Sequence, residues 1–381
     1  MAQLRLLIVD DSAMYRQALQ DIVATIPGVT CIGVACDGKE AMKKIISEKP
    51  DAVTLDMEMP VMTGMEVIKA VIAQNLETKL IIVSACSQTG AEVAINALKL
   101  GAYDFITKPN RLGGAGAKEH IHQQLVETLG LPNIGFTGAK AHSSITSSGA
   151  NHRVYSKRQK LSPTVKSRSM QIAPTGELLH PQAVVMGCST GGPKALLKLF
   201  AGLQDPVDVP IFIVQHMPPM FTQTLAKSIN EISVVSVKEA ENGDKPLPNH
   251  AYIAPGGRQM KLVKGSEGVE IRVTDDETNN FCKPSVDYFF DSVSDIYQAG
   301  VLGVILSGMG DDGCEGLRRM KRYGAKILGQ NEESCVVYGM PRVAQEAGLV
   351  DQQVGIEQMA AAIEGVLKGP TKGSKVNIKA S

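Results

Sequence analysis

The chain has 381 residues, of which 44% are hydrophobic and 20% are charged, and its 39 basic side chains balance its 39 acidic ones. This length and composition favour a globular protein with two domains. A formal net charge of zero gives no general attraction to nucleic acid or to membrane surfaces. The apolar runs are strand-sized, far short of the ~20 residues of a membrane-spanning helix. We therefore expect no nucleic-acid partner and no membrane-embedded segment.

The first residues, MAQLRLLIVDD, lead directly into a strand pattern and leave no room for a signal peptide. The seven cysteines are scattered and lack the paired C-x-x-C spacing of a zinc site. Both observations predict a cytoplasmic protein with reduced thiols. Cys188 precedes a serine of interest, and we expect it to be a buried apolar filler rather than a reactive thiol.

In residues 1–128, short apolar segments alternate with amphipathic helical segments. The predicted strands are residues 4–9, 30–35, 52–56, 79–85 and 103–107. Helices are predicted at residues 14–26, 39–49, 64–74 and 91–101. Repeats of this length indicate a doubly wound, five-stranded parallel sheet.

Polar side chains follow the predicted strands of this first domain. They are Asp10, Asp11, Asp56, Ser84 and Lys108. The carboxyl ends of parallel strands share one edge of a sheet, so these groups are expected to gather there. Three carboxylates suit a hard cation such as Mg²⁺, and Asp56 is placed to accept a phosphoryl group. The alternative is that acidic residues merely populate the turns after strands.

The same pattern, with Asp56 in LDMEMPVMTG and Lys108 followed by Pro109, resembles the receiver domain of two-component response regulators. The resemblance covers about residues 3–125 and implies a flavodoxin-like fold. It also implies phosphorylation of Asp56 by a histidine kinase, with Ser84 and Lys108 as switch residues.

By the same resemblance, Mg²⁺ would lie on Asp11 and Asp56, with Asp10 close behind and a backbone carbonyl supplied by Glu58. Phe105 would occupy the aromatic switch position.

Residues 129–178 are rich in Ser, Thr, Gly, Pro and basic side chains, with no hydrophobic period. This composition predicts a flexible linker, with a basic docking patch as the alternative. Residues 369–381 have similar character and predict a disordered tail.

Residues 179–368 show a second alternation of strands and helices. The predicted strands are residues 182–187, 209–215, 251–255, 301–307 and 325–330. Helices are predicted at residues 193–202, 220–230, 285–297, 314–324 and 358–368. Short, Pro- and Gly-punctuated strands between residues 237 and 273 suggest an antiparallel insertion in a Rossmann-like, parallel-dominated α/β domain.

Three of these strands end in residues with hydrolytic potential: Ser189, His216 and the pair Asp311–Asp312. If the strands are parallel, an alcohol, an imidazole and a carboxylate meet at one rim, as acyl transfer requires. The first helical turn after Ser189 would offer backbone N–H groups to an oxyanion. The alternatives are a phosphate cradle, a serine that only caps a helix, and a structural histidine.

The segments GCSTGGPKAL, IVQHMPPMF, YIAPGG, SGMGDDGCEG and QNEESCVVYGMP resemble, in family order, the catalytic domain of chemotaxis protein-glutamate methylesterases of the CheB type. The resemblance implies hydrolysis of glutamate methyl esters, and deamidation of certain glutamines, on methyl-accepting chemotaxis receptors. It implies no cofactor in the catalytic domain. Ser189 would be the nucleophile, His216 the base, and Asp312 rather than Asp311 the orienting carboxylate.

The oxyanion region would comprise Thr190, Gly191 and Met309 by that resemblance. We therefore expect a hydrolase controlled by phosphorylation, whose resting receiver hinders access to Ser189. The rival hypothesis is a phospho-switch adaptor that has lost catalysis. A DNA-binding output is disfavoured because the second half is α/β rather than a basic helical module.

Overall fold

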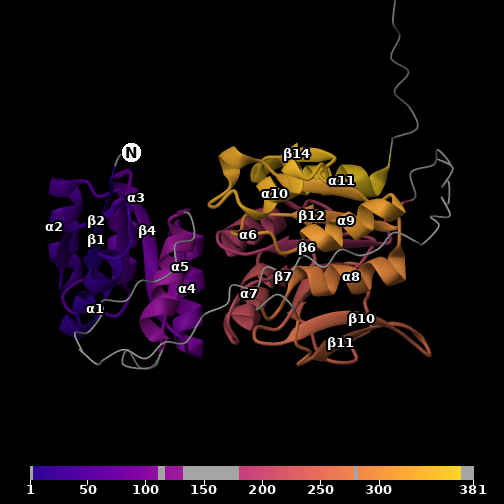
Figure 1. The fold of residues 1–381 in the computed structure, drawn as a ribbon, viewed down its shortest axis with the longest axis horizontal. Helices are drawn as coiled ribbons and strands as arrows, with labels where there is room; N and C mark the ends of the chain where they lie inside the picture. The colour runs from indigo at the N-terminus through magenta and orange to yellow at the C-terminus, as the bar shows by residue number, and fades with distance from the viewer. Residues whose placement is uncertain (1–2, 110–115, 132–179, 279–281, 370–381) are drawn as a thin grey trace, which may run out of the picture.

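The protein is described here by a computed structural model that covers residues 3–109, 116–131, 180–278 and 282–369 (Figure 1). Two α/β domains lie side by side, with the N-terminal domain in indigo to magenta and the C-terminal domain in rose to yellow. Residues 132–178 of the predicted linker and 370–381 of the predicted tail lie outside the described residues.

The N-terminal domain is a parallel five-stranded sheet of order β2-β1-β3-β4-β5, as the sequence predicts. Its strands are β1 (Leu4–Val9), β2 (Val29–Ala35), β3 (Ala52–Asp56), β4 (Lys79–Ala85) and β5 (Asp104–Lys108). Its helices are α1 (Ala13–Val23), α2 (Gly38–Glu48), α3 (Gly64–Ala73), α4 (Gln88–Leu100) and α5 (Ala117–Thr128).

Short polar residues start four of these helices. The side chains of Ser12, Asp37, Thr63 and Ser87 each accept a backbone N–H bond from the first turn of the helix that follows. Such caps satisfy donors that a helix end otherwise leaves unpaired. Helices α1, α2 and α4 begin at most four residues after the preceding strand ends, which keeps the polar strand-end residues at one edge of the sheet.

The C-terminal domain is built on a seven-stranded sheet of order β14-β13-β12-β6-β7-β9-β8, in which every pairing is parallel. These strands are β6 (Ala183–Cys188), β7 (Ile211–Gln215), β8 (Ser236–Glu239), β9 (His250–Ile253), β12 (Val301–Ile305), β13 (Lys326–Gln330) and β14 (Gln352–Val354). A separate antiparallel hairpin consists of β10 (Gln259–Gly265) and β11 (Gly268–Thr274).

The hairpin confirms an antiparallel insertion, but the insertion is shorter than the segment between residues 237 and 273. Within that segment β8 and β9 pair in parallel and extend the main sheet. The edge strands β8 and β14 were not predicted, because SVKE and QQV are short and polar and lack an apolar run. Edge strands often have this character, since it discourages pairing with another chain.

Helices cover both faces of the seven-stranded sheet. They are α6 (Gly192–Gly202), α7 (Phe221–Asn230), α8 (Val286–Tyr297), α9 (Cys314–Tyr323), α10 (Met340–Glu346) and α11 (Ile356–Lys368). One buried cluster joins α6, α7 and α11 to the sheet, and another joins α8, α9, α10 and the hairpin. Among the described residues, none of the helices combines the length and apolarity needed to cross a membrane.

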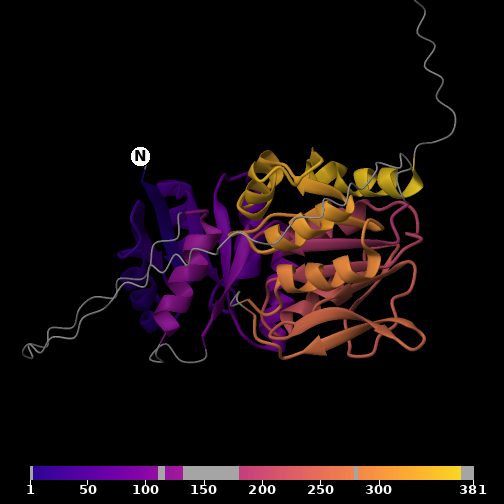
Figure 2. The same ribbon diagram turned by 45° about the vertical axis from the view of Figure 1, so that its right-hand side comes forward.

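The two domains are packed together through β5 and α4 of the first and α6 and α7 of the second (Figure 2). The rings of Phe105 and Phe221 stack with centroids 5.0 Å apart and planes 8° apart. Around this stack, Tyr103 donates to the carbonyl of Val336 at 2.9 Å. One buried hydrophobic cluster includes residues of both domains, so the contact is a packed interface.

Candidate active site

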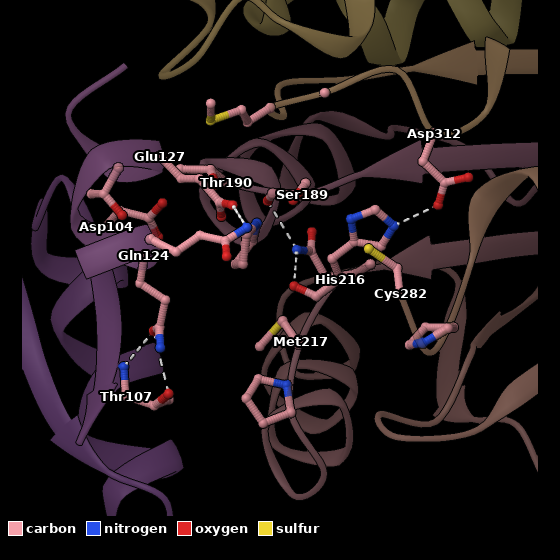
Figure 3. Close-up of a pocket in the computed structure, with 18 of the residues that line it drawn as sticks. Asp104, Thr107, Gln124, Glu127, Ser189, Thr190, His216, Met217, Cys282 and Asp312 are labelled. Carbon is pink, nitrogen blue, oxygen red and sulfur yellow. Dashed lines mark hydrogen bonds and ion pairs between the residues drawn. The ribbon is translucent and has the colours of Figure 1, made fainter. Parts of the chain in front are cut away.

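The sheet brings three of the predicted site residues to one rim. Strands β7, β6 and β12 are neighbours, and they are followed by His216, Ser189 and Asp312 respectively. The chain leaves β6 toward β7 on one side and returns to β12 on the other, which makes this a topological switch point. All three residues line one cavity of about 600 Å³ (Figure 3).

His216 and Asp312 form a direct pair. The Nε2 atom of His216 lies 2.8 Å from Oδ2 of Asp312, and the two side chains are 15% and 5% exposed. The neighbouring Asp311 is exposed and makes no such contact among the described residues. The geometry therefore places Asp312, rather than Asp311, behind the imidazole.

The Asp312 carboxylate is held at the start of helix α8. Its Oδ1 accepts bonds from Ser285 Oγ and the Asp287 N–H, and its Oδ2 accepts from the Val286 N–H at 2.7 Å as well as from His216. Burial opposes ionisation, but the His216 contact and these N–H groups lower the pKa of Asp312 below its usual range. The site thus holds a fixed negative charge behind the ring, favoured by the helix N-terminus.

The pairing determines which ring nitrogen is available. In the neutral ring, Nε2 carries the proton because it is bonded to Asp312, and Nδ1 keeps a lone pair. Burial favours a neutral ring, but hydrogen bonds with Asp312 and Cys282 raise the pKa of His216. An imidazolium formed during a reaction would be stabilised by the same contacts.

Ser189 lies at the end of β6 and is 9% exposed. Its N–H donates to Ser307 O at 3.0 Å, and its carbonyl accepts from Gly192 N at 2.8 Å. Helix α6 is capped by Gly191 at φ 78°, with no side-chain cap, so Ser189 is not the N-cap of this helix. Within the described residues, no hydrogen bond joins Ser189 Oγ to His216 in this domain arrangement.

The predicted oxyanion residues differ in what they contact. Gly191 donates its N–H to Oδ2 of Asp104 at 2.9 Å. This N–H is therefore already bonded to a carboxylate of the N-terminal domain. The N–H groups of Thr190 and Met309, which line the cavity, have no acceptor among the described residues. Burial raises the pKa of Asp104 to about 6, although N–H bonds from Phe105 and Gly191 act in the opposite direction.

Two polar side chains that the sequence analysis did not select hold the rim together. The amide Nε2 of Gln215 donates to the carbonyls of Ser189 and His216, at 2.9 and 3.1 Å. Ser307 Oγ donates to the carbonyl of Thr190 at 2.8 Å. Gln215 is the last residue of β7, and a polar residue ending a five-residue buried strand was the available signal.

A third missed residue is Cys282, which lines the same cavity and lies beside His216 (Figure 3). Cys188, the thiol that the sequence singled out, is fully buried as an apolar filler and lies close to the carbonyl of Val214. Burial strongly raises the pKa of the Cys188 thiol. The cysteine open to the cavity is therefore Cys282.

The acidic residues of the first domain also gather at a strand-end edge. Carboxylate oxygens of Asp10, Asp11 and Asp56 lie within 4.8 Å of one another. Lys108 bridges this group, with Nζ 2.9 Å from Asp10 and 2.8 Å from Asp56. Burial raises the pKa of Asp10 despite Lys108. Two buried carboxylates and the exposed Asp11, with a single ammonium beside them, fit a divalent hard cation such as Mg²⁺.

The remaining predicted receiver residues are placed around this cluster and the interface. Ser84 Oγ donates to the carbonyl of Gly90 at 2.8 Å at the start of α4. Phe105 faces the other domain and stacks on Phe221. Glu58 is exposed in the loop after β3, two residues beyond Asp56.

The fold and the two rims define a class of protein: a receiver-type domain joined to a hydrolase-type α/β domain. Family models agree, since residues 6–114 match the response regulator receiver domain and residues 184–363 match the CheB methylesterase model. The chain belongs to the CheB methylesterase family.

Its relatives match it along nearly their whole length. A protein-glutamate methylesterase/protein-glutamine glutaminase of Desulfotalea psychrophila is 41% identical, over 97% of this chain and 100% of its own. The Bacillus subtilis protein of the same name is 38% identical, over 96% and 99%. Among solved structures, the Thermotoga maritima CheB methylesterase catalytic domain is 35% identical, with a TM-score of 0.47 over 49% of this chain and 98% of that one.

Proposed function

We propose that this protein is a phosphorylation-activated protein-glutamate methylesterase and protein-glutamine glutaminase of chemotaxis receptors. The observation that carries the proposal is the His216–Asp312 pair on strands that flank the strand bearing Ser189. The names of the full-length relatives supply the substrate class. The enzyme would act in the cytoplasm on methyl-accepting receptors, with a chemotaxis histidine kinase as the phosphoryl donor.

The geometry supports a serine hydrolase mechanism. Nδ1 of His216 takes the Ser189 hydroxyl proton as Oγ attacks the ester carbonyl, and Asp312 on Nε2 stabilises the imidazolium. The tetrahedral oxyanion is received by N–H groups of Thr190 and Met309. The imidazolium then gives its proton to the departing methoxide, which leaves as methanol, and water hydrolyses the acyl-enzyme by the same sequence of proton transfers.

Glutamine deamidation uses the same residues. Attack of Ser189 on the side-chain amide gives the same kind of tetrahedral intermediate, with ammonia as the leaving group in place of methanol. The proton that His216 returns is needed more here, because an amide nitrogen leaves only after protonation. One site therefore serves both activities named for the relatives.

Control would pass through the interface that contains Asp104 and Phe105. In the packed arrangement, Asp104 accepts a hydrogen bond from the Gly191 N–H, two residues from the nucleophile. Residues of the receiver domain also line the catalytic cavity. Strand β5 carries Asp104 at one end and Lys108, bound to Asp56, at the other. A phosphoryl group on Asp56 would attract the Lys108 ammonium. The resulting shift of Lys108, at the end of β5, would weaken the β5 contact with the catalytic rim.

The acidic cluster of Asp10, Asp11 and Asp56 would hold Mg²⁺. When bound there, the cation neutralises charge that develops on the transferred phosphoryl group. Lys108 would supply the second positive charge. Ser84, on β4 next to β3, would bind a phosphoryl oxygen once its bond to Gly90 is exchanged.

The decisive experiment is methanol release from a methylated receptor fragment by the full chain and its Ser189→Ala variant, each with Mg²⁺ and a small acyl-phosphate donor. Loss of release with receptor binding retained supports the enzyme, and continued release would show the nucleophile to be wrong. Ser266→Ala, in the exposed turn between β10 and β11, is the matched control and should leave release unchanged. An adaptor without catalysis would release no methanol in any of the three proteins.

A further inference from the structure

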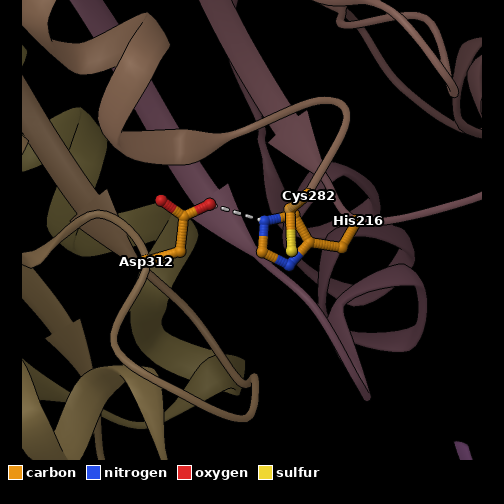
Figure 4. A group of neighbouring side chains, drawn as sticks. All are labelled: His216, Cys282 and Asp312. Carbon is orange, nitrogen blue, oxygen red and sulfur yellow. Dashed lines mark hydrogen bonds and ion pairs between the residues drawn. The ribbon is translucent and has the colours of Figure 1, made fainter. Parts of the chain in front are cut away.

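The catalytic cavity holds a thiol for which the proposed hydrolysis has no use. Cys282 lies between β11 and α8, is half-buried and lines the cavity with Ser189 and His216. A nitrogen of His216, the sulfur of Cys282 and an oxygen of Asp312 lie within 4.8 Å of one another (Figure 4). The cavity-lining thiol therefore stands next to the group that acts as the base.

These groups suit a borderline-soft divalent cation. Zn²⁺ binds imidazole nitrogen at about 2.0–2.1 Å and thiolate sulfur at about 2.3 Å, so two such ligands lie roughly 3.5 Å apart around a tetrahedral ion. The Cys282 sulfur lies within 4.8 Å of a ring nitrogen of His216, and rotation of the Cys282 side chain would bring it to the coordination spacing at Nδ1. Figure 4 shows the Cys282 sulfur against the ring of His216, and one ring nitrogen bonded to Asp312.

The Asp312 contact strengthens the fit. A histidine that binds a metal commonly donates its other ring N–H to a carboxylate, which fixes the tautomer and makes the ligating nitrogen more basic. His216 already makes that bond, at 2.8 Å through Nε2. Its Nδ1 is thus prepared to bind a cation for the same reason that it is prepared to act as a base.

We propose that His216 and Cys282 form an inhibitory site for Zn²⁺ or a similar borderline-soft cation in the catalytic cavity. The Cys282 thiol releases its proton to solvent and binds the ion as thiolate, and neutral His216 binds through the Nδ1 lone pair. Water completes the coordination, and no oxidation or reduction takes place. The bound ion occupies the lone pair that would accept the Ser189 proton, so hydrolysis stops until the ion is removed.

The rest of the described chain does not compete strongly for such an ion. Within the described ranges, the other group of three possible ligands is the carboxylate set of Asp10, Asp11 and Asp56, whose oxygen atoms prefer hard cations. Excess Mg²⁺ can keep that set filled during a zinc titration. Cys188 and Cys314 are buried, whereas Cys282 lines the open cavity.

Metal binding can be measured without activity. With excess Mg²⁺ present, the full chain should bind one Zn²⁺ in a calorimetric titration, and Co²⁺ as a substitute should give a thiolate-to-cobalt charge-transfer band. Cys282→Ala and Cys282→Ser should each weaken binding at least tenfold and abolish the band.

Cys36→Ala, which removes an exposed receiver thiol, is the matched control and should bind as the unaltered chain does. Equal Zn²⁺ affinity in both Cys282 variants, or a Co²⁺ band that persists without Cys282, would overturn the proposal.

The inhibitory effect rests on the proposed function, and a second measurement separates the two. Zn²⁺ should suppress methanol release by the unaltered chain and by Cys36→Ala, with recovery on chelation. Each Cys282 variant should release methanol with Zn²⁺ at nearly the rate that the same variant shows without metal.

Ser189→Ala should still bind one Zn²⁺, and should show the cobalt band with Co²⁺, although it is inactive. If Ser189→Ala binds Zn²⁺ but the unaltered chain releases no methanol, the hydrolase proposal fails and the metal site stands. Failure of binding in Ser189→Ala and the unaltered chain alike removes the metal site alone.

Discussion

The protein has two polar rims at the carboxyl ends of parallel sheets, and they are stabilised in different ways. In the catalytic rim, the Asp312 carboxylate accepts bonds from two backbone N–H groups, a serine hydroxyl and His216. In the receiver rim, Asp10 accepts from the Ser12 N–H, and its other partner within the described ranges is Lys108; burial raises the pKa of Asp10. The Asp312 carboxylate thus has its bonds supplied by its own domain, whereas in the receiver rim three carboxylates share a single ammonium among the described residues.

The difference suits the two tasks. A catalytic rim gains rate when its dipoles are already oriented before the reaction. A switch must instead respond to an added ligand, which it does when the ligand binds one of two arrangements more tightly than the other. The predictions below test each half of this comparison, beginning with the largest expected effect.

Replacing Asp312 with Asn should reduce kcat for methanol release by about 10³–10⁴, because the ring loses the partner that fixes its tautomer. The change is nearly isosteric, so thermal unfolding should show that the fold persists. Asp311→Asn, at the exposed neighbouring position, is the matched control and should be close to neutral. A similar loss in both variants would mean that Asp312 has no special role behind His216.

Replacing Lys108 with Met should lower the free energy of unfolding by about 3–5 kcal/mol in the absence of divalent cations, because two buried carboxylates lose their counter-charge. Added Mg²⁺ should recover part of this loss, since a ligand that binds only the folded state stabilises it. Urea unfolding with chelator or with Mg²⁺ measures both effects.

The control for this experiment is Lys118→Met, which breaks the exposed pair with Asp21 and should cost less than about 1 kcal/mol. If Mg²⁺ stabilises Lys108→Met no more than it stabilises the unaltered chain, the acidic cluster is not the cation site.

Docking of the two domains should weaken as pH rises, because Asp104 loses its proton. Burial raises the pKa of Asp104 from 3.8 to about 6, so the docked form binds this proton more tightly than an undocked form would. Its contribution to docking is complete below about pH 4 and is lost as pH rises through about 6. A shift of this size corresponds to at most about 3 kcal/mol.

Asp104→Asn keeps an oxygen for the Gly191 N–H but removes the charge. Small-angle X-ray scattering of the unphosphorylated chain should therefore show docking that varies with pH in the unaltered protein and in an Asp21→Asn control, but not in Asp104→Asn. The variant should also be less active than the unaltered chain at neutral pH without phosphodonor. Equal pH dependence in all three proteins would exclude Asp104 as the source.

Asp104 also shows where sequence reasoning stopped. The apolar runs and helical periods were enough to predict both parallel sheets, and the strand ends predicted that Ser189, His216 and Asp312 share a rim. Those inferences depend on local periodicity and on one rule of sheet geometry. Edge strands such as β8, which carry little apolar pattern, were missed.

Contacts between distant segments could not be inferred in the same way. Nothing local to Asp104 indicates that its carboxylate meets Gly191, and nothing local to Cys282 indicates that its sulfur meets His216. Both contacts depend on how loops pack after the sheets have formed. Cys188 adjoins Ser189 in the chain and is buried in the core, as its apolar surroundings in the sequence predict.

The aromatic stack provides the smallest and most specific test of the comparison. Phe105→Ala removes a ring that lies 5.0 Å from Phe221 at the interface and leaves the receiver rim and the catalytic rim otherwise intact. Such a pair stabilises an interface by about 0.5–1.5 kcal/mol beyond the area it buries, so unphosphorylated Phe105→Ala should hydrolyse receptor esters roughly two- to tenfold faster than the unphosphorylated unaltered chain.

Lys99→Ala, which removes an exposed ion pair with Glu231 across the same interface, should change the rate little. With phosphodonor present, the rates of Phe105→Ala and the unaltered chain should converge if phosphorylation releases the same contact. A Phe105→Ala enzyme that is slower without phosphodonor would mean that the receiver assists the catalytic rim rather than restraining it.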